Sequence, residues 1–421
     1  MPLKTRIHKL LRSSERYFKT DMVYLARGGS WLTLGQVFLT VSSFFLTLAY
    51  ANLLPKDIFG TYKYVLSIGG VLGALTLTGM GPALLRATAR GVKDILEVAF
   101  WTQLKWSALT LSATLLGAGY YFINNNHLLS ISLLIVGLFS PLSQSAGLYS
   151  SFLIGKKEFR TKVLYDFIYI LVPFFVIVGV LFSTDDLLLL VLAYFISYTC
   201  VAVFLYKKVL HTYHDSKPLP ASLDTDTISY AKHLSVINIF NTVAGQLDKV
   251  LIFHYLGAVQ LAVYALPLAP ITHMTGFLKS IHTLSLPKLV NQKMRTIQET
   301  LPAKAVRLVF ILMIPTLLYI FAAPYLYKIL FPKYIESVIY SQLYAAMILL
   351  YPIEFIKTSV TAHAPARSLY TLTLTGTFIK VGLLGILLPL YGILGAILAI
   401  MLYTIIHGLV TYYFFQNMRP S

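Results

Sequence analysis

Apolar runs of membrane length recur along the chain and are separated by short polar stretches. A bilayer core about 30 Å thick needs about 20 mostly apolar residues in helical form. The runs do not alternate in polarity as strands would, and an open sheet in lipid would leave backbone groups unpaired. The pattern therefore predicts an all-α integral membrane protein. Its twelve predicted transmembrane helices cover residues 31–54, 62–84, 98–123, 128–154, 163–183, 187–206, 233–256, 261–284, 304–325, 334–357, 369–388 and 391–415.

The composition agrees with this interpretation. Of 421 residues, 57% are hydrophobic and 12% are charged, and the mean hydropathy is +0.73. A typical soluble domain is about 45–50% apolar and about 25% charged. These values exclude both a soluble globular protein and a disordered chain.

The net charge of +18 would by itself suit a nucleic-acid-binding protein. The basic residues, however, lie between the apolar runs, where the positive-inside rule places them. With a cytoplasmic N-terminus, 26 of the 34 Lys and Arg residues fall in cytoplasmic segments and only Lys56, Lys63, Lys328 and Lys333 in outer ones. We therefore expect a multi-pass protein of the cytoplasmic (plasma) membrane, with both termini in the cytoplasm and no nucleic-acid partner.

The polar stretches divide the chain into predicted regions. Leu3, Ile7, Leu10 and Leu11 recur at helical spacing among basic residues, which favours a cytoplasmic basic amphipathic helix on the membrane surface over a solvated tail. The predicted regions are this N-terminal segment (1–30), an N-terminal six-helix bundle (31–206), a cytoplasmic linker (207–232), a C-terminal six-helix bundle (233–415) and a cytoplasmic tail (416–421).

The two halves show traces of a duplication. The stretch Phe59-Gly60-Thr61-Tyr62 follows the first span, and Leu261-Ala262-Val263-Tyr264 follows the seventh at an offset of 202. Six spans return the chain to the same side of the membrane, so the halves would be parallel repeats with a cleft between them.

Helix-breaking residues inside the spans are compatible with a transporter that changes conformation. Pro267 and Pro270 interrupt the eighth span, and Gly69, Gly70 and Gly73 loosen the corresponding second span. Matching interruptions are typical of transport sites. Proline and glycine are also simply commoner in membrane helices, and that alternative stays open. Prolines also lie inside the fourth, fifth, ninth and tenth spans, at Pro141, Pro173, Pro315 and Pro352.

Enzyme motifs are absent from the sequence. It contains no phosphate-binding G-x-x-x-x-G-K-[ST] loop, no H-E-x-x-H zinc motif and no G-x-S-x-G nucleophile motif. Its one cysteine, Cys200, excludes a disulfide framework and a cysteine-ligated metal site. We expect neither an enzyme nor a resident cofactor or metal.

Charges at membrane depth are the candidate functional residues, because they are costly there and usually functional. Asp248 and Lys380 lie near the middle of their spans, Lys249 is adjacent to Asp248, and Arg86 lies near an inner end. An excess of basic groups suits an anionic ligand such as a phosphate. A purely structural pairing of Asp248 with Lys380 or Lys249 is the alternative. Secondary candidates are Lys63, Lys105, Lys279, Glu354 and Lys357.

Two stretches resemble the polysaccharide-biosynthesis (lipid-linked oligosaccharide) flippases of the multidrug/oligosaccharidyl-lipid/polysaccharide (MOP) exporter superfamily. The first runs from Leu46 through Phe59-Gly60-Thr61-Tyr62 to Thr78-Gly79-Met80-Gly81-Pro82 and Arg86. The second is Gln246-Leu247-Asp248-Lys249-Val250-Leu251-Ile252 with Leu256-Gly257. The resemblance implies a fold like that of the multidrug exporters (MATE-like), with two six-helix bundles around a central cavity.

The resemblance also implies a function. The protein would move a polyprenyl-pyrophosphate-linked oligosaccharide from the inner to the outer leaflet by alternating access. Its expected partners are this substrate, the phospholipid bilayer, a polysaccharide polymerase and glycosyltransferases; the coupling ion, Na⁺ or H⁺, is left open. Related drug exporters often carry an acid in the first helix, and residues 31–54 contain none. A multidrug/cation antiporter is therefore the second candidate. A membrane-embedded glycosyltransferase is a third, resting on Asp185 and Asp186 in an outer loop.

The charge distribution predicts the accessibility of single cysteines introduced into loops. Cysteines at Asn125 and Asp185 should react with a membrane-impermeant thiol reagent added outside the cell, and cysteines at Lys157, Ser216 and Lys293 should not. Labelling of intact cells measures this, and reaction at position 157 from outside would refute the topology.

Overall fold

The structure is a computed structural model that describes residues 22–92, 95–213, 225–290, 294–364 and 366–418. Within these ranges the chain forms helices and turns and no strand. The helices are α2 (Met22–Leu53), α3 (Lys56–Gly73), α4 (Met80–Ala89), α5 (Ile95–Trp106), α6 (Ala108–Ile123), α7 (His127–Ala146), α8 (Leu148–Gly155), α9 (Phe159–Ser183), α10 (Leu187–Tyr213), α11 (Thr225–Leu256), α12 (Ala258–Val290), α13 (Met294–Leu330), η1 (Pro332–Ser337), α14 (Val338–Ala346), η2 (Met347–Leu350), α15 (Ile353–His363) and α16 (Ala366–Asn417).

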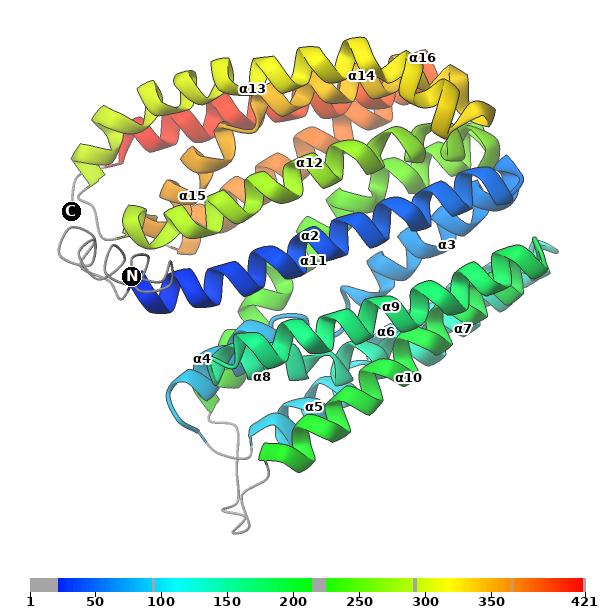
Figure 1. Ribbon diagram of the computed structural model, residues 1–421, viewed down its shortest axis with the longest axis horizontal. Coiled ribbons are helices and arrows are strands. Elements are labelled where there is room, and N and C mark those ends of the chain that lie inside the picture. Colours follow the sequence, from blue (N-terminus) through cyan, green and yellow to red (C-terminus); the bar gives the residue numbers. More distant parts are fainter. Residues whose placement is uncertain (1–21, 93–94, 214–224, 291–293, 365, 419–421) are drawn as a thin grey trace, which may run out of the picture.

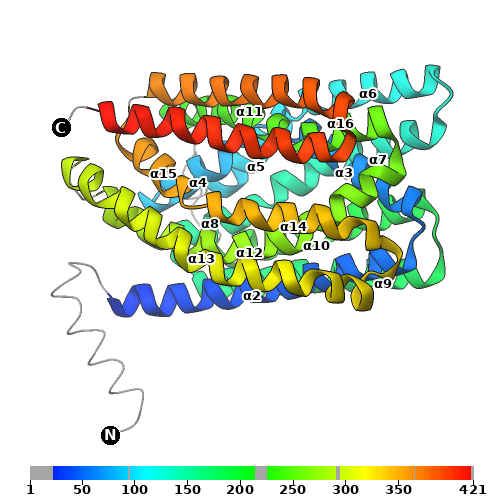
Figure 2. The ribbon, with the colours of Figure 1, turned by 90° about the horizontal axis from the view of Figure 1, so that it is seen from above.

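The helices form two lobes that correspond to the two halves of the chain (Figure 1). The N-terminal lobe contains α2–α10 and the C-terminal lobe α11–α16, and the two meet along α2, α3, α4, α11 and α12. The start of α2 and the end of α16 lie at the same end of the bundle (Figures 1 and 2). We call this the terminal end and the opposite one the far end.

The described helices supply the twelve expected passes. Seven are individually long and apolar enough to cross a membrane, and the bent pair Pro332–Leu350 and Ile353–Thr361 makes an eighth. The remaining passes come from α12, from the two broken passes α3–α4 and α5–α6, and from α16, which folds back on itself. The prediction of an all-α membrane protein with twelve spans is thus confirmed.

The last two spans are joined by a very tight turn at Gly392, whose φ of 58° is in the left-handed region that favours glycine. At Gly395, an added Cβ would lie 1.9 Å from the Leu387 carbonyl oxygen. The two glycines therefore allow α16 to reverse direction without a separate loop.

Irregular backbone at membrane depth is stabilised by side chains of neighbouring helices, as lipid cannot supply hydrogen bonds. Between α3 and α4, the Gly79 amide donates to the Ser235 hydroxyl at 2.9 Å and the Thr76 hydroxyl to Gln144 Oε1 at 3.1 Å. The tenth span bends by 48° near Pro352.

The predicted matching interruption of the eighth span is wrong. Helix α12 runs unbroken through Pro267 and Pro270. Membrane helices tolerate proline when neighbouring helices and local adjustments satisfy the freed carbonyl groups. The second span, in contrast, breaks just after its glycine-rich stretch, at residues 74–79.

Equivalent positions in the two halves support the duplication. Helix α3 begins at Lys56 and α12 at Ala258, at the offset of 202 that the sequence indicated. Tyr62 and Tyr264, the matching tyrosines, are both completely buried. The two matching helices also contact each other: a Cβ added at Gly60 would lie 1.8 Å from the Ala258 carbonyl oxygen.

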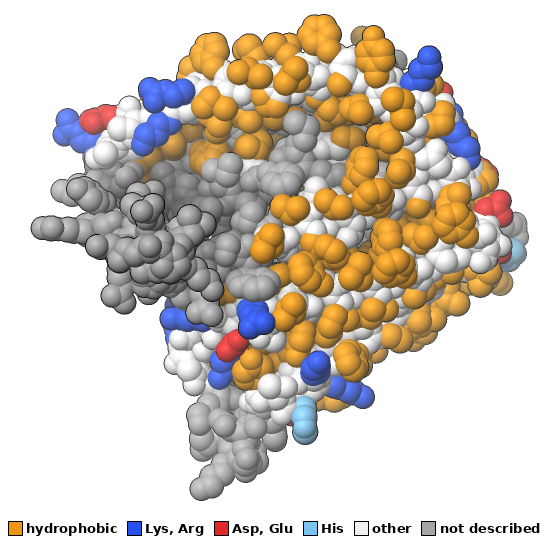
Figure 3. Space-filling model, in the orientation of Figure 1, with side chains coloured by type: hydrophobic (Ala, Val, Ile, Leu, Met, Phe, Trp, Pro, Cys, Tyr) orange, Lys and Arg blue, Asp and Glu red, His pale blue; other side chains and the backbone are white. Residues whose placement is uncertain are grey.

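Large apolar side chains cover the outside of the bundle, as expected for a surface in contact with lipid. Examples are Phe182 (74% exposed), Phe321 (74%) and Ile123 (80%). In the face drawn in Figure 3, hydrophobic side chains cover the middle and charged ones gather towards the two ends. The protein is therefore a multi-pass membrane protein.

The helices extend beyond the spans that hydropathy predicted. Helix α10 continues to Tyr213 and α11 begins at Thr225, so much of the predicted linker 207–232 is helical. Residues 22–30 of the predicted N-terminal segment belong to α2. The rest of this segment, residues 1–21, and the tail residues 419–421 lie outside the described residues.

The contact at Gly60 predicts a specific loss of stability. The Gly60→Ala substitution should lower the thermal midpoint, because overpacking a close contact costs about 1–3 kcal/mol. Gly119→Ala in α6 is the control: it has nothing within 4 Å and should be neutral or stabilising by about 0.5–1 kcal/mol. Thermal unfolding in detergent measures both, and equal shifts would contradict the contact.

Candidate functional site

The two lobes are held together at the far end by polar contacts. The Asn52 amide donates to the Leu330 carbonyl at 2.9 Å, and the Lys333 ammonium donates to the Asn52 carbonyl at 2.7 Å. Lys56 forms an ion pair with Glu336 at 2.6 Å. These contacts join the end of the first span to the segment around η1, so the lobes are closed against each other here.

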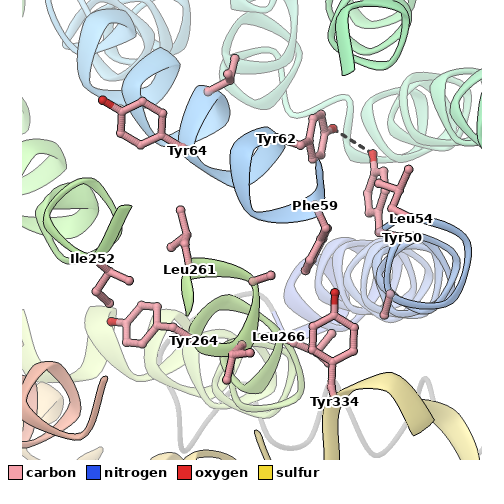
Figure 4. Close-up of a cluster of buried hydrophobic side chains, with 14 of the residues drawn as sticks. Tyr50, Leu54, Phe59, Tyr62, Tyr64, Ile252, Leu261, Tyr264, Leu266 and Tyr334 are labelled. Carbon is pink, nitrogen blue, oxygen red and sulfur yellow. Dashed lines mark hydrogen bonds between the residues drawn. The ribbon is translucent and has the colours of Figure 1, made fainter. Parts of the chain in front are cut away.

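An aromatic cluster that includes Tyr50, Phe59, Tyr62 and Tyr334 (Figure 4) lies next to these contacts, because the Lys56 ammonium is 5.3 Å from the Tyr334 ring centroid. The Tyr50 and Tyr62 hydroxyls form a hydrogen bond of 2.8 Å. The Phe59 ring meets the Tyr334 ring edge-on at 6.3 Å, and the Tyr64 ring stacks on Phe253 at 3.9 Å. Phe59 and Tyr62 are completely buried. The Phe-Gly-x-Tyr motif thus has a packing role at the seam between the lobes.

At the terminal end, the seventh span contacts the second span and, through Lys232 and Trp106, the third. The Ser235 hydroxyl accepts from Gly79, and Asn238 Nδ2 approaches the Thr78 hydroxyl at 3.4 Å. The Arg86 guanidinium lies 5.2 Å from the Tyr230 ring centroid. Helix α11 therefore packs against α4, where the second span resumes after its break.

Between these two regions lies a group of four charges that influence one another, which we call the central charge cluster: Lys63, Asp248, Lys249 and Lys380. Lys63 is close enough to Lys249 to be affected by its charge, and Lys380 by the charges of both Asp248 and Lys249. The lysines come from both lobes: Lys63 from α3, Lys249 from α11 and Lys380 from α16. The cluster carries more positive than negative charge.

Lys63 and Lys249 are half-buried and have no acidic partner among the described residues. The Lys63 ammonium lies 5.1 Å from the Phe59 ring centroid and 5.7 Å from that of Tyr50, within cation–π range. The Lys249 ammonium donates to Gln246 Oε1 at 2.8 Å. Two like charges thus approach each other across the seam without a neutralising carboxylate.

Asp248 is buried, with 4% of its surface exposed. Its Oδ2 accepts a hydrogen bond from the completely buried Tyr264 hydroxyl, whereas its Oδ1 has no partner among the described residues. Lys380, 8% exposed, donates to the Ala244 carbonyl on α11. Neither Lys380 nor Lys249 forms an ion pair with Asp248 in the part of the chain that the structure describes, so a simple structural pair is not what the geometry shows.

The other predicted site residues lie apart from this cluster. Arg86 is at the terminal end of α4 against Tyr230. Lys105 is exposed on α5. Glu354 and Lys357 form an ion pair of 2.7 Å on α15. Lys279 lies in a stretch of α12 whose side chains are not described.

Sequence reasoning missed the tyrosines that accompany the charges. Tyr264 holds Asp248, and the charge of Asp248 also acts on Tyr344 of α14. Tyrosine is common in this chain, with 29 residues, so no single one stood out. The available signal was the offset of 202, which pairs Tyr264 with Tyr62 in the Phe-Gly-x-Tyr motif.

The geometry suits recognition of an anion. Ammonium groups in a poorly solvated region interact strongly with phosphate or carboxylate, because the surroundings screen them less than water does. The cluster lies between the closed far end and the second-span break, and its groups come from both lobes. A ligand bound there would touch both halves of the molecule.

Comparisons with known proteins find solved structures with a similar fold. A solved structure of the lipid II flippase MurJ in an inward closed conformation is similar, with a TM-score of 0.71 and 12% identity, over 92% of this chain and 87% of that chain. An outward-facing multidrug resistance MATE family transporter of the MOP superfamily has a TM-score of 0.63 and 12% identity, over 92% and 94%. An inward-facing structure of such a transporter has a TM-score of 0.60 and 12% identity, over 90% and 94%.

At such low identity these structures establish the fold alone: two bundles of six helices, as in the MOP-superfamily transporters. No curated protein matches the sequence significantly. A family model described as "Polysaccharide biosynthesis protein" matches residues 25–292, which is more than half of the chain. The chain therefore belongs to the polysaccharide biosynthesis protein family.

Proposed function

We propose that this protein is a flippase that carries an anionic lipid-linked oligosaccharide across the cytoplasmic membrane by alternating access. Its family and fold make it a membrane transporter or flippase. The observation that carries the finer proposal is the central charge cluster, in which Lys63, Lys249 and Lys380 outnumber Asp248. The diphosphate that joins the lipid to the sugar is negatively charged and would neutralise the excess positive charge of the cluster.

The proposed orientation places the terminal end in the cytoplasm, following the 26 basic residues predicted there. The far end, closed by the Lys56–Glu336 and Asn52–Leu330 contacts, then faces outward. In this state the cluster would receive its substrate from the inner leaflet. Opening the far end and closing the terminal end would release it to the outer leaflet.

Binding of the anion would change how the two lobes are arranged relative to each other. Lys63 on one lobe and Lys249 on the other repel each other when the cluster is empty. A diphosphate between them replaces repulsion by two attractions, and a ligand shifts an equilibrium by as much as its affinities for the two states differ. The charge of the substrate would therefore favour the arrangement of the lobes in which Lys63 and Lys249 both contact the diphosphate.

The two alternative functions receive less support. A cationic drug would meet the net positive charge of the cluster, which disfavours a multidrug antiporter. The glycosyltransferase hypothesis rests on Asp185 and Asp186, in the loop between α9 and α10. Asp186 instead accepts from the Leu188 amide at 2.7 Å and the Leu189 amide at 3.1 Å, which makes it the N-terminal cap of α10.

Transport by purified protein tests the proposal. Proteoliposomes containing the protein should make a polyprenyl-diphosphate-linked oligosaccharide, loaded in one leaflet, accessible to a lectin on the other side. Protein-free liposomes are the control for spontaneous movement. Transport of a cationic dye in place of the lipid-linked sugar would overturn the proposal.

The lysines of the cluster predict a charge-specific defect. Lys63→Gln and Lys249→Gln should each weaken binding of the lipid diphosphate about tenfold to a hundredfold, since a hydrogen bond to a charged group is worth about 1.5–3 kcal/mol. Lys63→Arg and Lys249→Arg should lose less. Lys105→Gln is the matched control, because Lys105 is exposed and lies apart from the cluster. Equal defects in all three glutamine variants would remove the cluster from the binding site.

A further inference from the structure

Polar and apolar residues are separated on opposite sides of α11 in the stretch 235–249. A helix turns by about 100° per residue, so spacings of three and four residues mark one face. Such a row is formed by Ser235, Asn238, Thr242, Gln246 and Lys249. Asn241, Gly245 and Asp248 flank the row on one side, and the rest of the stretch consists of Val, Ile, Phe, Ala and Leu. The seventh span therefore has a polar side within the membrane.

The polar row faces the N-terminal lobe. The Ser235 hydroxyl accepts a hydrogen bond from the Gly79 amide at 2.9 Å. Higher on the helix, a Cβ added at Gly70 of α3 would lie 3.4 Å from Gln246 Nε2. Both partners belong to the second span, so the row lies at the seam between the lobes.

The flank of the row faces the C-terminal lobe. Asn241 and Asp248 are seven residues apart, which is two helical turns, so they point in nearly the same direction. Asp248 is buried and accepts a hydrogen bond from Tyr264 of α12. The polar side of α11 is therefore bordered by both lobes and turned away from the lipid.

The middle of the polar side has hydrogen-bonding groups to spare. Asn241 is exposed, and neither its amide nor the half-buried Thr242 hydroxyl forms a hydrogen bond among the described residues. The bond from Asn238 Nδ2 to the Thr78 hydroxyl is long, at 3.4 Å. Gly245 is exposed, and a Cβ added to it would have no atom within 4 Å. Open space thus adjoins donors and acceptors that the protein itself does not use.

The chemistry of these groups suits an uncharged ligand rich in hydroxyls. An amide side chain offers two donors and an acceptor, and a hydroxyl offers one donor and accepts as well. Sugar hydroxyls likewise both donate and accept. An anion would instead be drawn to the lysines, and a metal cation would need several oxygen ligands that are mostly carboxylates or carbonyls.

The position of the row relative to the lysines also suits a sugar. Lys249 ends the row at the central charge cluster, and its ammonium donates to Gln246 Oε1 at 2.8 Å. At 1.5 Å per residue, the helix rises by about 16 Å from Asn238 to Lys249. A short oligosaccharide joined to a diphosphate at Lys249 has room to extend along the row towards the terminal end.

We infer that the polar side of α11 between Asn238 and Gln246 binds the sugar units of the lipid-linked substrate, while Lys63 and Lys249 hold its diphosphate. This inference rests on the proposed function and adds the site that recognises the sugar. The amides of Asn238 and Asn241 and the hydroxyl of Thr242 contact the sugar hydroxyls, so these side chains discriminate between sugars.

Two lipids separate sugar binding from diphosphate binding. One is the lipid-linked oligosaccharide extracted from the cells that make this protein, and the other is a polyprenyl diphosphate of the same chain length without sugar. Titrations of the full-length protein in detergent, followed by native mass spectrometry, give the two dissociation constants. The protein should bind the sugar-bearing lipid more tightly than the sugar-free one.

Substitutions in the middle of the row should affect only the sugar-bearing lipid. Asn241→Ala and Thr242→Val should each weaken its binding about twofold to tenfold, as expected for loss of a neutral hydrogen bond, and leave the sugar-free lipid unchanged. Thr242→Ser keeps the hydroxyl and should retain affinity. Val236→Ala, on the apolar side of the same helix, is the matched control and should change neither constant.

Filling the open space provides a second test. Gly245→Leu should keep the thermal midpoint of the protein, because nothing lies within 4 Å of the added Cβ. It should weaken binding of the sugar-bearing lipid at least as much as Asn241→Ala does, again without effect on the sugar-free lipid.

The outcomes distinguish this inference from the proposed function. Failure of the protein to bind either lipid would overturn both. Equal affinity for the two lipids would overturn only the sugar site, and so would variants of Asn241, Thr242 and Gly245 that weaken both lipids equally or neither of them. The polar side of α11 would then serve only to line a path for water.

Discussion

Uncompensated positive charge inside the membrane is the constraint on which the rest of the structure depends. A lysine at the centre of a bilayer costs at least about 2.5–3.5 kcal/mol, so it must face a partner, water or a cavity. Lys380 lies near the buried Asp248 and near Lys249, and Lys249 lies near Lys63; none of the three lysines forms an ion pair with Asp248 in the described part of the chain. Such an arrangement requires helices that shield it from lipid, and under the proposed function the ligand would supply the missing negative charge.

The packing around the cluster combines apolar and polar contacts. The two lobes share a hydrophobic core, in which Phe59 meets Tyr334 and Tyr64 stacks on Phe253. They also meet through small residues, as at Gly60 against Ala258, and through polar contacts at the ends, such as Lys56 with Glu336. The second span breaks at residues 74–79, where Ser235 and Gln144 satisfy the freed backbone and side-chain groups. Polar contacts of this kind can be exchanged for others at modest cost, because water or another polar group can take the place of each partner.

Hydropathy and charge predicted the fold well because each span must be long and apolar independently of its neighbours. The offset of 202 between Tyr62 and Tyr264 even identified the matching helices α3 and α12. The site was predicted only in part. Asp248, Lys249 and Lys380 stood out as charges at membrane depth, but Lys63 was counted with the outer segments, since hydropathy cannot show that α3 turns it towards Lys249. Arg86 was chosen for its charge, and packing places it against Tyr230, away from the cluster. The Tyr264 hydroxyl carries no charge, so its hydrogen bond to Asp248 became visible only when the helices were assembled.

Under the proposed function, the charge of the substrate acts through the lysines of both lobes and determines how the lobes are arranged. The most direct measurement is the distance between spin labels at the far end, one on Asn124 after α6 and one on Tyr325 of α13, recorded by pulsed electron paramagnetic resonance in lipid nanodiscs. A polyprenyl diphosphate should change the distribution of this distance, and the uncharged polyprenol of the same length should not. An identical response to both lipids, or no response to the diphosphate, would contradict this role of the substrate charge.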